Sequence, residues 1–321
     1  ACALAPVAVA AKPVAASWAK KEIRLVVEQG LMAPDVQSFR PDDELTRGEL
    51  EELVGGLTGF LAAPPANPEA LVTTAQLDAR LVRALELRDV SATFAAGARA
   101  AGLKPTSRFG TEVVARLLGL RKNHPAAQDA LERLPNEPAT RAEAAYSAAR
   151  ILGFQGWEAG AVREAAASFA LPELDAWQRR ILQTAFSLVG YPYVWGGESE
   201  TLERGFDCSG FVWRVYKLQA YPEAPQLAET LRGRTTFTMS AEFPRKERIG
   251  FDELAPGDLV FFGAKGPRSK PAQVDHMGIY AGSGWMVHSS RDGVALTPLA
   301  GWYRERFAWG RRPLAEAGLA H

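Results

Sequence analysis

The chain changes its pattern of apolar and polar positions about halfway along its length. From residue 17 to about residue 168, apolar residues recur every three or four positions between turns that contain proline and glycine, which predicts helices. Another helical stretch covers residues 177–188 and ends at Gly190. Three shorter apolar runs predict strands: 259–262, 277–281 and 285–287. The pattern predicts an all-α region followed by an α+β region.

The same pattern divides the chain into three expected segments. Residues 1–16 are mostly alanine, proline and valine and are typical of a linker, residues 17–168 form the expected helical domain, and residues 172–315 the expected α+β domain. The opening Ala-Cys-Ala-Leu tract resembles the small-residue sequence next to a signal cleavage site, without a basic leader region, and an arbitrary chain boundary is the alternative. An exported protein is expected mainly from the rest of the chain. Cys2 is also a candidate for lipid attachment.

Composition argues against several classes of function. The 37 basic residues balance 37 acidic ones without a basic tract, whereas binding to nucleic acid needs a positive footprint. No apolar run reaches the roughly 20 residues of a membrane-spanning helix. The 2 cysteines and 4 histidines lack the spacing of a zinc site or a disulfide scaffold, so neither a metal nor an organic cofactor is expected.

An internal repeat runs through the helical region. Three segments share a proline, four further residues and then Thr-x-x-Glu or Thr-x-x-Gln, and they begin at Pro41, Pro68 and Pro135. In such a capping box the threonine hydroxyl accepts a free helix N–H while the acidic or amide side chain reaches back. The predicted boxes are Thr46 with Glu49, Thr73 with Gln76, and Thr140 with Glu143. Three unrelated helix starts would give the same boxes, so the caps alone do not establish a repeat.

A helix led by Trp18, a Phe-Arg-Pro loop and the Thr-Arg-x-Glu sequence of the first segment together resemble the S-layer homology repeat. The resemblance covers about residues 17–153 and implies three helical units in a small bundle that holds proteins on the cell wall by gripping wall polymer. Arg47 and Arg141 occupy the position of the arginine in the motif, which makes them the candidate polymer contacts. Thr74 stands at that position in the second unit.

Cys208 stands at the predicted start of a buried helix, because Phe211, Val212 and Val215 follow it at helical spacing. Unpaired N–H groups and the positive end of the helix dipole lower the pKa of a thiol at such a position from ~8.5 toward neutrality. Asp207 is the natural N-cap of this helix, and its carboxylate is also placed to face substrate. A free cysteine is more often a small buried hydrophobic residue, and the histidines that follow are what favour catalysis.

Two histidines, His276 and His288, flank a predicted hairpin with a Gly-Ser-Gly loop. A three-residue loop pairs Ala281 with Trp285. In that register Gly278 lies opposite His288 and leaves the space beside it clear, and His276 is the diagonal neighbour of His288 on the same face. A slip of one residue would send His288 to the opposite face, so the arrangement depends on the register.

Five ordered motifs lie within about residues 172–313: Tyr-x-Trp-Gly-Gly, Asp-Cys-Ser-Gly-Phe, Pro-Gly-Asp-Leu-Val-Phe-Phe, His-Met-Gly-Ile-Tyr and Val-His-Ser. In this order they resemble the NlpC/P60 family of cell-wall cysteine peptidases. The resemblance implies a papain-like core, in which a helix that carries the nucleophile packs on an antiparallel sheet that carries the bases. It also implies that Cys208 is the nucleophile, His276 the base and His288 the third, orienting residue.

The resemblance adds candidates for contacts with substrate. Tyr193 matches a family tyrosine beside the nucleophile, with a role in steadying the oxyanion or positioning substrate, and simple packing against Trp195 is an equal alternative. Asp207 and Ser209, on either side of the cysteine, are further candidates for substrate binding or oxyanion support. Arg234 is a candidate partner for a substrate carboxylate.

The implied reaction is hydrolysis of peptidoglycan stem peptides, after γ-D-glutamate and before diaminopimelate or lysine, through a thioester intermediate. The resemblance also implies a secreted or cell-envelope location, with wall polymer as a further partner of the helical region. Two alternatives stay open. One is a wall-binding or assembly protein whose peptidase fold is weak or inactive, and the other is an amidase or acyltransferase that uses the same fold on another amide.

Overall fold

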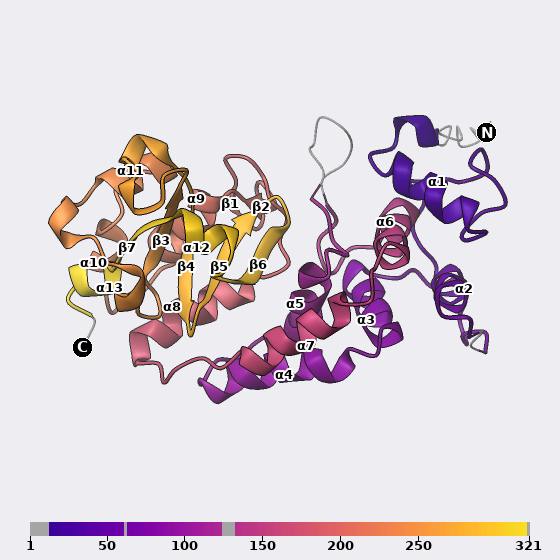
Figure 1. Cartoon of the computed structure of the whole chain (residues 1–321), viewed down its shortest axis with the longest axis horizontal. Helices are drawn as coiled ribbons and strands as arrows, with labels where there is room; N and C mark the ends of the chain where they lie inside the picture. The colour runs from indigo at the N-terminus through magenta and orange to yellow at the C-terminus, as the bar shows by residue number, and fades with distance from the viewer. Residues whose placement is uncertain (1–12, 61–62, 124–131, 320–321) are drawn as a thin grey trace, which may run out of the picture. The chain divides into compact units, whose positions relative to one another are not determined.

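The structure is a computed structural model, and it describes residues 13–60, 63–123 and 132–319 (Figure 1). Cys2, the candidate for lipid attachment, lies outside the described residues. Within the described segments, no helix combines the length and the apolar character that crossing a bilayer requires.

The chain crosses between two compact units more often than its pattern predicts. The N-terminal unit combines residues 1–77 with 124–155, and the C-terminal unit combines residues 78–123 with 156–321. The division expected near residues 168–172 therefore differs from the compact units, because helices of the segment 78–123 pack with the C-terminal sheet. Periodicity shows that a helix has an apolar face, but it does not show which neighbour covers that face.

Threonine capping boxes start three helices of the N-terminal unit, α2 (Arg47–Thr58), α3 (Thr74–Ala84) and α6 (Arg141–Leu152), as predicted. The N–H groups of Glu49, Gln76 and Glu143 donate to the hydroxyls of the threonines three residues earlier, at 3.3, 3.3 and 3.2 Å. The side chains of the same three residues accept from the threonine N–H groups in return. The unit also contains α1 (Lys20–Glu28), and only the start of α3 belongs to it.

A closed ring of main-chain hydrogen bonds joins the three repeat segments. The N–H of Leu45 donates to the carbonyl of Ala139 at 2.8 Å, and the N–H of Ala139 donates to the carbonyl of Val72 at 2.8 Å. The N–H of Val72 closes the ring by donating to the carbonyl of Leu45 at 2.9 Å. Each of these residues precedes its capping threonine by one position, so the segments occupy equivalent places. The ring therefore distinguishes a threefold repeat from three unrelated helix starts.

We predict that Thr140→Ala lowers the free energy of unfolding of the N-terminal unit by about 1 kcal/mol, because the buried first turn of α6 loses its cap. Thr58→Ala is the matched control, since its hydroxyl donates to the carbonyl of Val54 and accepts from the exposed N–H of Phe60 at the end of α2 but caps no helix start, and a change within about 0.5 kcal/mol is expected. Urea unfolding followed by circular dichroism measures both. Equal losses in the two variants would contradict a role for the capping box.

Helices from residues 88–117 and 158–187 form part of the C-terminal unit. Aromatic contacts join these helices to the rest of the unit: Phe94 meets Trp285 edge to face, with ring centroids 5.7 Å apart, and Phe109 stacks on Phe186 at 5.1 Å. Phe169 completes the first cluster by meeting Trp285 edge to face at 5.2 Å. The helices are α4 (Arg88–Ala100), α5 (Phe109–Leu117), α7 (Glu158–Ser168) and α8 (Ala176–Ser187).

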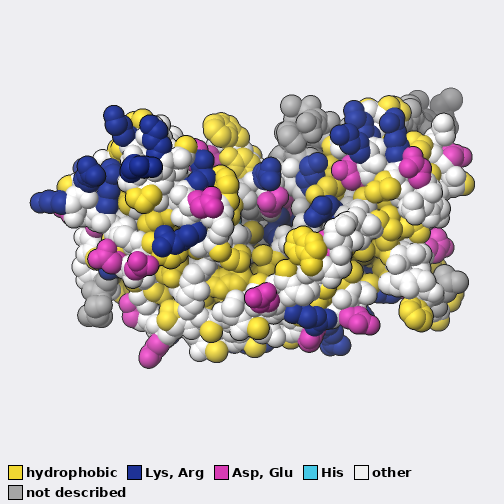
Figure 2. Space-filling model, viewed as in Figure 1, with side chains coloured by type: hydrophobic (Ala, Val, Ile, Leu, Met, Phe, Trp, Pro, Cys, Tyr) yellow, Lys and Arg dark blue, Asp and Glu magenta, His cyan; other side chains and the backbone are white. Residues whose placement is uncertain are grey.

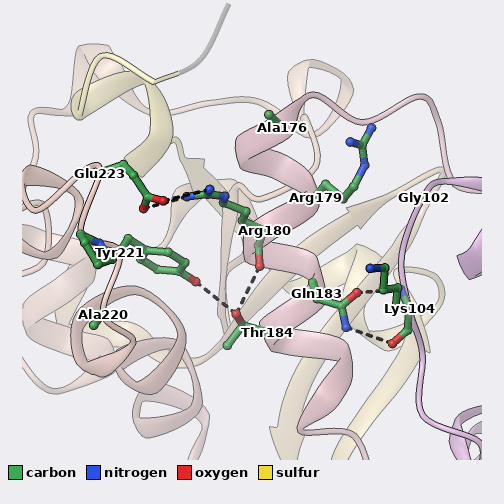
Figure 3. Close-up of a pocket in the computed structure, with 11 residues that line it drawn as sticks. Gly102, Lys104, Ala176, Arg179, Arg180, Gln183, Thr184, Ala220, Tyr221 and Glu223 are labelled. Atoms are coloured by element: carbon green, nitrogen blue, oxygen red, sulfur yellow. Dashed lines mark hydrogen bonds and ion pairs between the residues drawn. The ribbon is translucent and has the colours of Figure 1, made fainter.

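The loop between α4 and α5 is clamped to α8 by one side chain (Figure 3). The amide of Gln183 accepts from the N–H of Lys104 at 2.7 Å and donates to the carbonyl of the same residue at 3.1 Å. Nearby on α8, Arg180 pairs with Glu223 at 3.0 Å and Thr184 bonds Tyr221 at 3.2 Å. These residues line a surface groove, and the polar side chains named here bond to one another or to the main chain of the groove.

Five antiparallel strands form the sheet of the C-terminal unit, in the order β6-β5-β4-β3-β7 (Figure 1). The three predicted strand runs correspond to β3, β4 and β5. The strands are β3 (Leu259–Gly263), β4 (Val274–Gly282), β5 (Trp285–Ser290), β6 (Gly293–Pro298) and β7 (Phe307–Arg311). A two-stranded sheet, β1 (Glu198–Ser199) with β2 (Gly205–Phe206), lies earlier in the chain.

Short helices surround the five-stranded sheet. One of them, α9 (Cys208–Trp213), packs on β4 and β5 and continues as the π-helix η2 (Arg214–Leu218). This confirms the predicted α+β domain, in which a helix that begins at the cysteine packs on an antiparallel sheet. On the face shown in Figure 2, charged side chains of both signs lie among apolar ones. The remaining short helices are α10 (Gln226–Glu229), α11 (Thr236–Ala241), α12 (Trp302–Arg306) and α13 (Pro313–Glu316).

Candidate active site

Helix α9 begins where the sequence places it, and Asp207 caps it. The carboxylate of Asp207 accepts from the N–H of Gly210 at 2.5 Å and from the N–H of Gly196 at 2.9 Å. Gly210 has to be glycine, because a Cβ there would lie 1.9 Å from the carbonyl oxygen of Gly197. The cap and this close approach together hold the loop at 196–197 against the first turn of the helix that carries Cys208.

The thiol of Cys208 is nearly buried, with 9% of the residue exposed. Its sulfur lies 3.3 Å from the hydroxyl oxygen of Thr236, and the main-chain N–H groups of Met277 and Ser209 also stabilise its thiolate form. Burial nevertheless dominates and raises the pKa of Cys208 above its ordinary value. The expected depressed pKa is therefore corrected: the helix start favours the thiolate, but loss of solvent outweighs it.

The two histidines meet in a direct hydrogen bond. Nε2 of His276 lies 2.7 Å from Nδ1 of His288, and the rings are edge to face with centroids 5.0 Å apart. Burial lowers the pKa of His276 to about 4, and burial with the charge of His276 lowers the pKa of His288 well below its ordinary value. Both rings are therefore neutral near pH 7 in the free protein.

The hairpin has the predicted register near His288, but its turn is shorter than predicted and its register shifts by one residue. Its turn has two residues, Ser283 at φ 50° and Gly284 at φ 78°, so Trp285 pairs with Gly282 and not with Ala281. The register then shifts by one residue between Tyr280 and Gly282, which restores the expected pairing further along, where Ile279 opposes Val287. A Cβ on Gly278 would lie 2.9 Å from the Cβ of His288, so the glycine does clear the space beside this ring.

A threonine that the sequence analysis did not single out extends the histidine pair. Nε2 of His288 lies 3.1 Å from the hydroxyl oxygen of Thr297, on the neighbouring strand β6. Two sets of protons fit these contacts, and the set that a general base requires has Nε2–H of His276 donating to Nδ1 of His288 and Nε2–H of His288 donating to Thr297. This leaves Nδ1 of His276 as the nitrogen that can accept a proton.

Two further residues of the site also carried no signal in the sequence. Tyr303 on α12 packs on both histidine rings, with centroids 6.0 Å from His276 and 5.0 Å from His288. Thr236 begins α11 and contacts Cys208 across 28 positions of sequence. Neither contact follows from spacing along the chain, since each depends on how separate elements pack.

Three of the four predicted substrate contacts, Asp207, Ser209 and Arg234, bond to one another. Arg234 donates to the hydroxyl of Ser209 at 2.9 Å, to the carboxylate of Asp207 at 3.3 Å and to the carbonyls of Gly196 and Gly197. Arg234 also pairs with the carboxylate of Glu198, which lies on β1 and not in the Asp-Cys-Ser-Gly-Phe motif. Ser209 donates to Asp207 at 3.0 Å. These three residues form an internal network under the start of α9, because the positive charge of the arginine is neutralised by protein carboxylates.

Tyr193 lines a cleft that also contains His276. The cleft has a volume of about 730 Å³ and also contains Asp275, Ser290, Arg291, Asp292, Trp302, Tyr303 and Arg306. Burial, followed by the negative charges of Cys208 and Asp207, raises the pKa of Tyr193 to about 12. The phenol is therefore protonated near neutral pH and can donate a hydrogen bond. Trp195, the alternative packing partner, is 87% exposed.

In the N-terminal unit, the two candidate polymer contacts differ. Arg141 is buried, where it pairs with Glu49, donates to the carbonyl of Met32 at 2.6 Å and lies 4.9 Å from the ring centre of Phe39. Arg47 is exposed at the start of α2. The two positions are equivalent in the repeat, but only Arg47 presents its guanidinium to solvent.

A cysteine at a helix start, a histidine pair and a hydroxyl that orients the second histidine are together the arrangement of a cysteine peptidase. Comparison with known proteins gives the same class. Residues 190–312 match the model of the NlpC/P60 family, and residues 11–51 match the S-layer homology domain. Residues 190–312 thus form an NlpC/P60 cysteine peptidase domain, with Cys208, His276 and His288 placed like a triad, and an S-layer homology domain lies near the N-terminus.

Three curated relatives are similar to part of the chain. The gamma-D-glutamyl-L-lysine dipeptidyl-peptidase of Bacillus subtilis is 33% identical over 36% of this chain and 33% of its own length. The bifunctional muramidase/DL-endopeptidase CwlT of the same organism is 34% identical over 41% of this chain and 35% of its length. The murein DD-endopeptidase MepH of Escherichia coli is 35% identical over 39% of this chain and 41% of its own length. The chain therefore spans well under half of each relative.

We predict that the C-terminal unit loses stability as the pH falls from about 6.5 toward 4. His276 is held neutral by burial with a folded pKa of about 4, so between these values the unfolded chain binds the proton that the folded chain does not. One such histidine contributes a slope of up to about 1.4 kcal/mol per pH unit. Thermal unfolding of the wild type and of His276→Gln between pH 7 and pH 4 tests this. The variant keeps a donor toward His288 and should show the shallower decline, and parallel curves would contradict the assignment.

Proposed function

We propose that the C-terminal unit is a peptidoglycan endopeptidase that cleaves the stem peptide between γ-D-glutamate and the diamino acid, with Cys208 as nucleophile and His276 as base. The observation that carries the proposal is the chain of hydrogen bonds from His276 on β4 through His288 on β5 to Thr297 on β6. The N–H of Met277, next to His276 on β4, stabilises the thiolate form of Cys208. The relatives named above are, by name, a gamma-D-glutamyl-L-lysine dipeptidyl-peptidase, a DL-endopeptidase and a DD-endopeptidase, and the glutamyl bond is the one that the resemblance to the NlpC/P60 family implies.

The first step couples loss of the thiol proton to attack on the amide. Because burial favours the neutral thiol and the neutral imidazole, the proton passes from Cys208 to Nδ1 of His276 as the sulfur bonds to the carbonyl carbon. The bond from Nε2–H to His288 stabilises the imidazolium that forms. The N–H of Cys208 lies in the first turn of α9, where helix N–H groups have no partner four residues back, and it donates to the oxyanion.

The second half of the reaction returns the enzyme to its starting state. The imidazolium of His276 protonates the leaving amine, which breaks the C–N bond and leaves a thioester on Cys208. A water molecule gives a proton to His276 and attacks the thioester, so that the new carboxylate departs and the thiol is restored. Tyr193, protonated over this pH range, is placed to donate to the substrate beside the sulfur.

The N-terminal unit extends the proposal to the location of the enzyme. We propose that it holds the peptidase in the cell envelope by binding wall polymer, as its S-layer homology match suggests. Arg47 is the side chain that supports binding, since it is exposed. Arg141 serves the fold of this unit, because its guanidinium is buried against Glu49 and Phe39.

Digestion of purified peptidoglycan tests the reaction. Wild-type protein should release fragments whose new ends, identified by mass spectrometry, are a γ-D-glutamyl carboxylate and a diamino-acid amine. Cys208→Ala should lower the rate at least ~10³-fold, since the variant lacks the sulfur that forms the thioester. Fragments cut at another bond would change the proposed substrate, and equal rates in the two proteins would refute the cysteine mechanism. Equal melting temperatures of wild type and variant exclude loss of fold as the cause.

A further inference from the structure

Helix α5 lies outside residues 190–312 but contacts the main chain of two segments that line the cleft. We propose that Arg116 and Asn123, at and just beyond the end of α5, are positioning residues for the substrate-binding side of the active site. The inference rests on the proposed endopeptidase activity and extends it to a part of the chain that the family match does not cover.

Arg116 is a buried arginine whose partners are fixed. Its Nε donates to the carboxylate of Glu112, one turn earlier on α5, at 2.9 Å, and both side chains are almost fully buried. Its remaining nitrogens donate to the main-chain carbonyls of Gly190, at 3.0 Å, and Asp292. A planar guanidinium that serves one carboxylate and two carbonyls in different directions holds those carbonyls in a fixed relation.

The two carbonyls belong to segments that lie side by side at the cleft. The N–H of Gly190 donates to the carbonyl of Val294 at 2.9 Å, and the N–H of Val294 donates to the carbonyl of Tyr191 at 2.8 Å. Gly293 fits against this junction only because it has no side chain: its φ is 74°, and a Cβ would lie 2.7 Å from Nη1 of Arg116. Arg116 therefore fixes the turn between β5 and β6, whose residues 290–292 line the cleft.

Asn123 acts on the same segment as Gly190, three residues further along the chain at Tyr193. Its side-chain oxygen accepts from the N–H of Tyr193 at 2.9 Å. Tyr193 lines the cleft, and its phenol lies close enough to Cys208 for the thiolate charge to raise the pKa of the phenol. The main chain of Tyr193 also forms a bridge with Phe206, two residues before the nucleophile. Asn123 thus sets the position of the one predicted substrate contact that the structure leaves facing the cleft.

The same helices carry a natural control for these contacts. Gln183 clamps the α4–α5 loop to α8 through two hydrogen bonds to Lys104, in a groove whose lining residues are all different from those of the cleft (Figure 3). If α5 only stabilised the unit, loss of the Gln183 clamp would resemble loss of Arg116 or Asn123. If α5 positions the cleft, substitution of Arg116 or Asn123 should lower turnover by more than the loss of stability explains, and substitution of Gln183 should not.

The experiment compares Arg116→Lys, Asn123→Ala and Gln183→Ala in the full chain, with a soluble stem peptide as substrate. We expect Arg116→Lys to raise KM and Asn123→Ala to lower kcat, each reducing kcat/KM about 10- to 100-fold, as small misplacements of substrate do. Gln183→Ala should stay within about twofold of wild type once its melting temperature is taken into account. Alkylation of Cys208 by iodoacetamide, followed by peptide mapping, should proceed at the wild-type rate in all three variants, because the thiol and its histidines are untouched.

The outcomes separate the inference from the proposed function. Suppose that the wild type cleaves the peptide, but kcat/KM falls in all three variants in proportion to the stability that each has lost. The positioning role is then overturned and the proposed reaction stands. The same conclusion follows if alkylation of Cys208 slows in the variants whose kcat/KM falls. If the wild type does not cleave the peptide although Cys208 is alkylated, the proposed reaction and the inference both fail. If Arg116→Lys does not fold, Asn123→Ala alone tests the positioning role, since this variant loses the hydrogen bond to the N–H of Tyr193 and keeps the bonds of Arg116.

Discussion

The catalytic geometry depends on the register of the β4–β5 hairpin, because that register decides whether two histidines meet. Side chains alternate across a sheet, so a slip of one residue would remove His288 from His276 and break the 2.7 Å contact between them. Two features compensate each other here: the turn is one residue shorter than expected, and the register shifts by one residue between Tyr280 and Gly282. Gly278 supplies the remaining condition, which is room for the second ring.

Burial sets the electrostatic character of the site. The thiol of Cys208 and both imidazoles are removed from water, which favours their neutral forms over the ion pair that a helix start alone would promote. Arg234 does not change this balance, because it is already paired with Asp207 and Glu198. Arg234 and Asp207 also bind the loop at 196–197 to the start of α9, since Arg234 donates to the carbonyls of Gly196 and Gly197 and Asp207 accepts from the N–H of Gly196.

The compact units do not follow the order of the sequence. Helices α4, α5 and α7 precede the peptidase domain in the chain but pack with it, through Phe94, Phe109 and Phe169. Arg116 and Asn123 show the functional consequence, since their hydrogen bonds end on the main chain at the edge of the cleft. The residues that line the cleft all belong to the family domain, and two side chains from outside that domain bond to its main chain.

The sequence by itself determined the elements whose causes are local. The threonine boxes at Thr46, Thr73 and Thr140, the helix that starts at Cys208 and three of the five strands follow from propensities and contacts within a few residues. The ordered motifs also identified the peptidase domain. Tertiary structure alone decided the roles of Thr236, Thr297 and Tyr303, the inward turn of Arg234 and the membership of α5 in the C-terminal unit. Each of these depends on contacts between segments far apart in the chain and on burial, which a pattern of residues along one strand or helix does not contain.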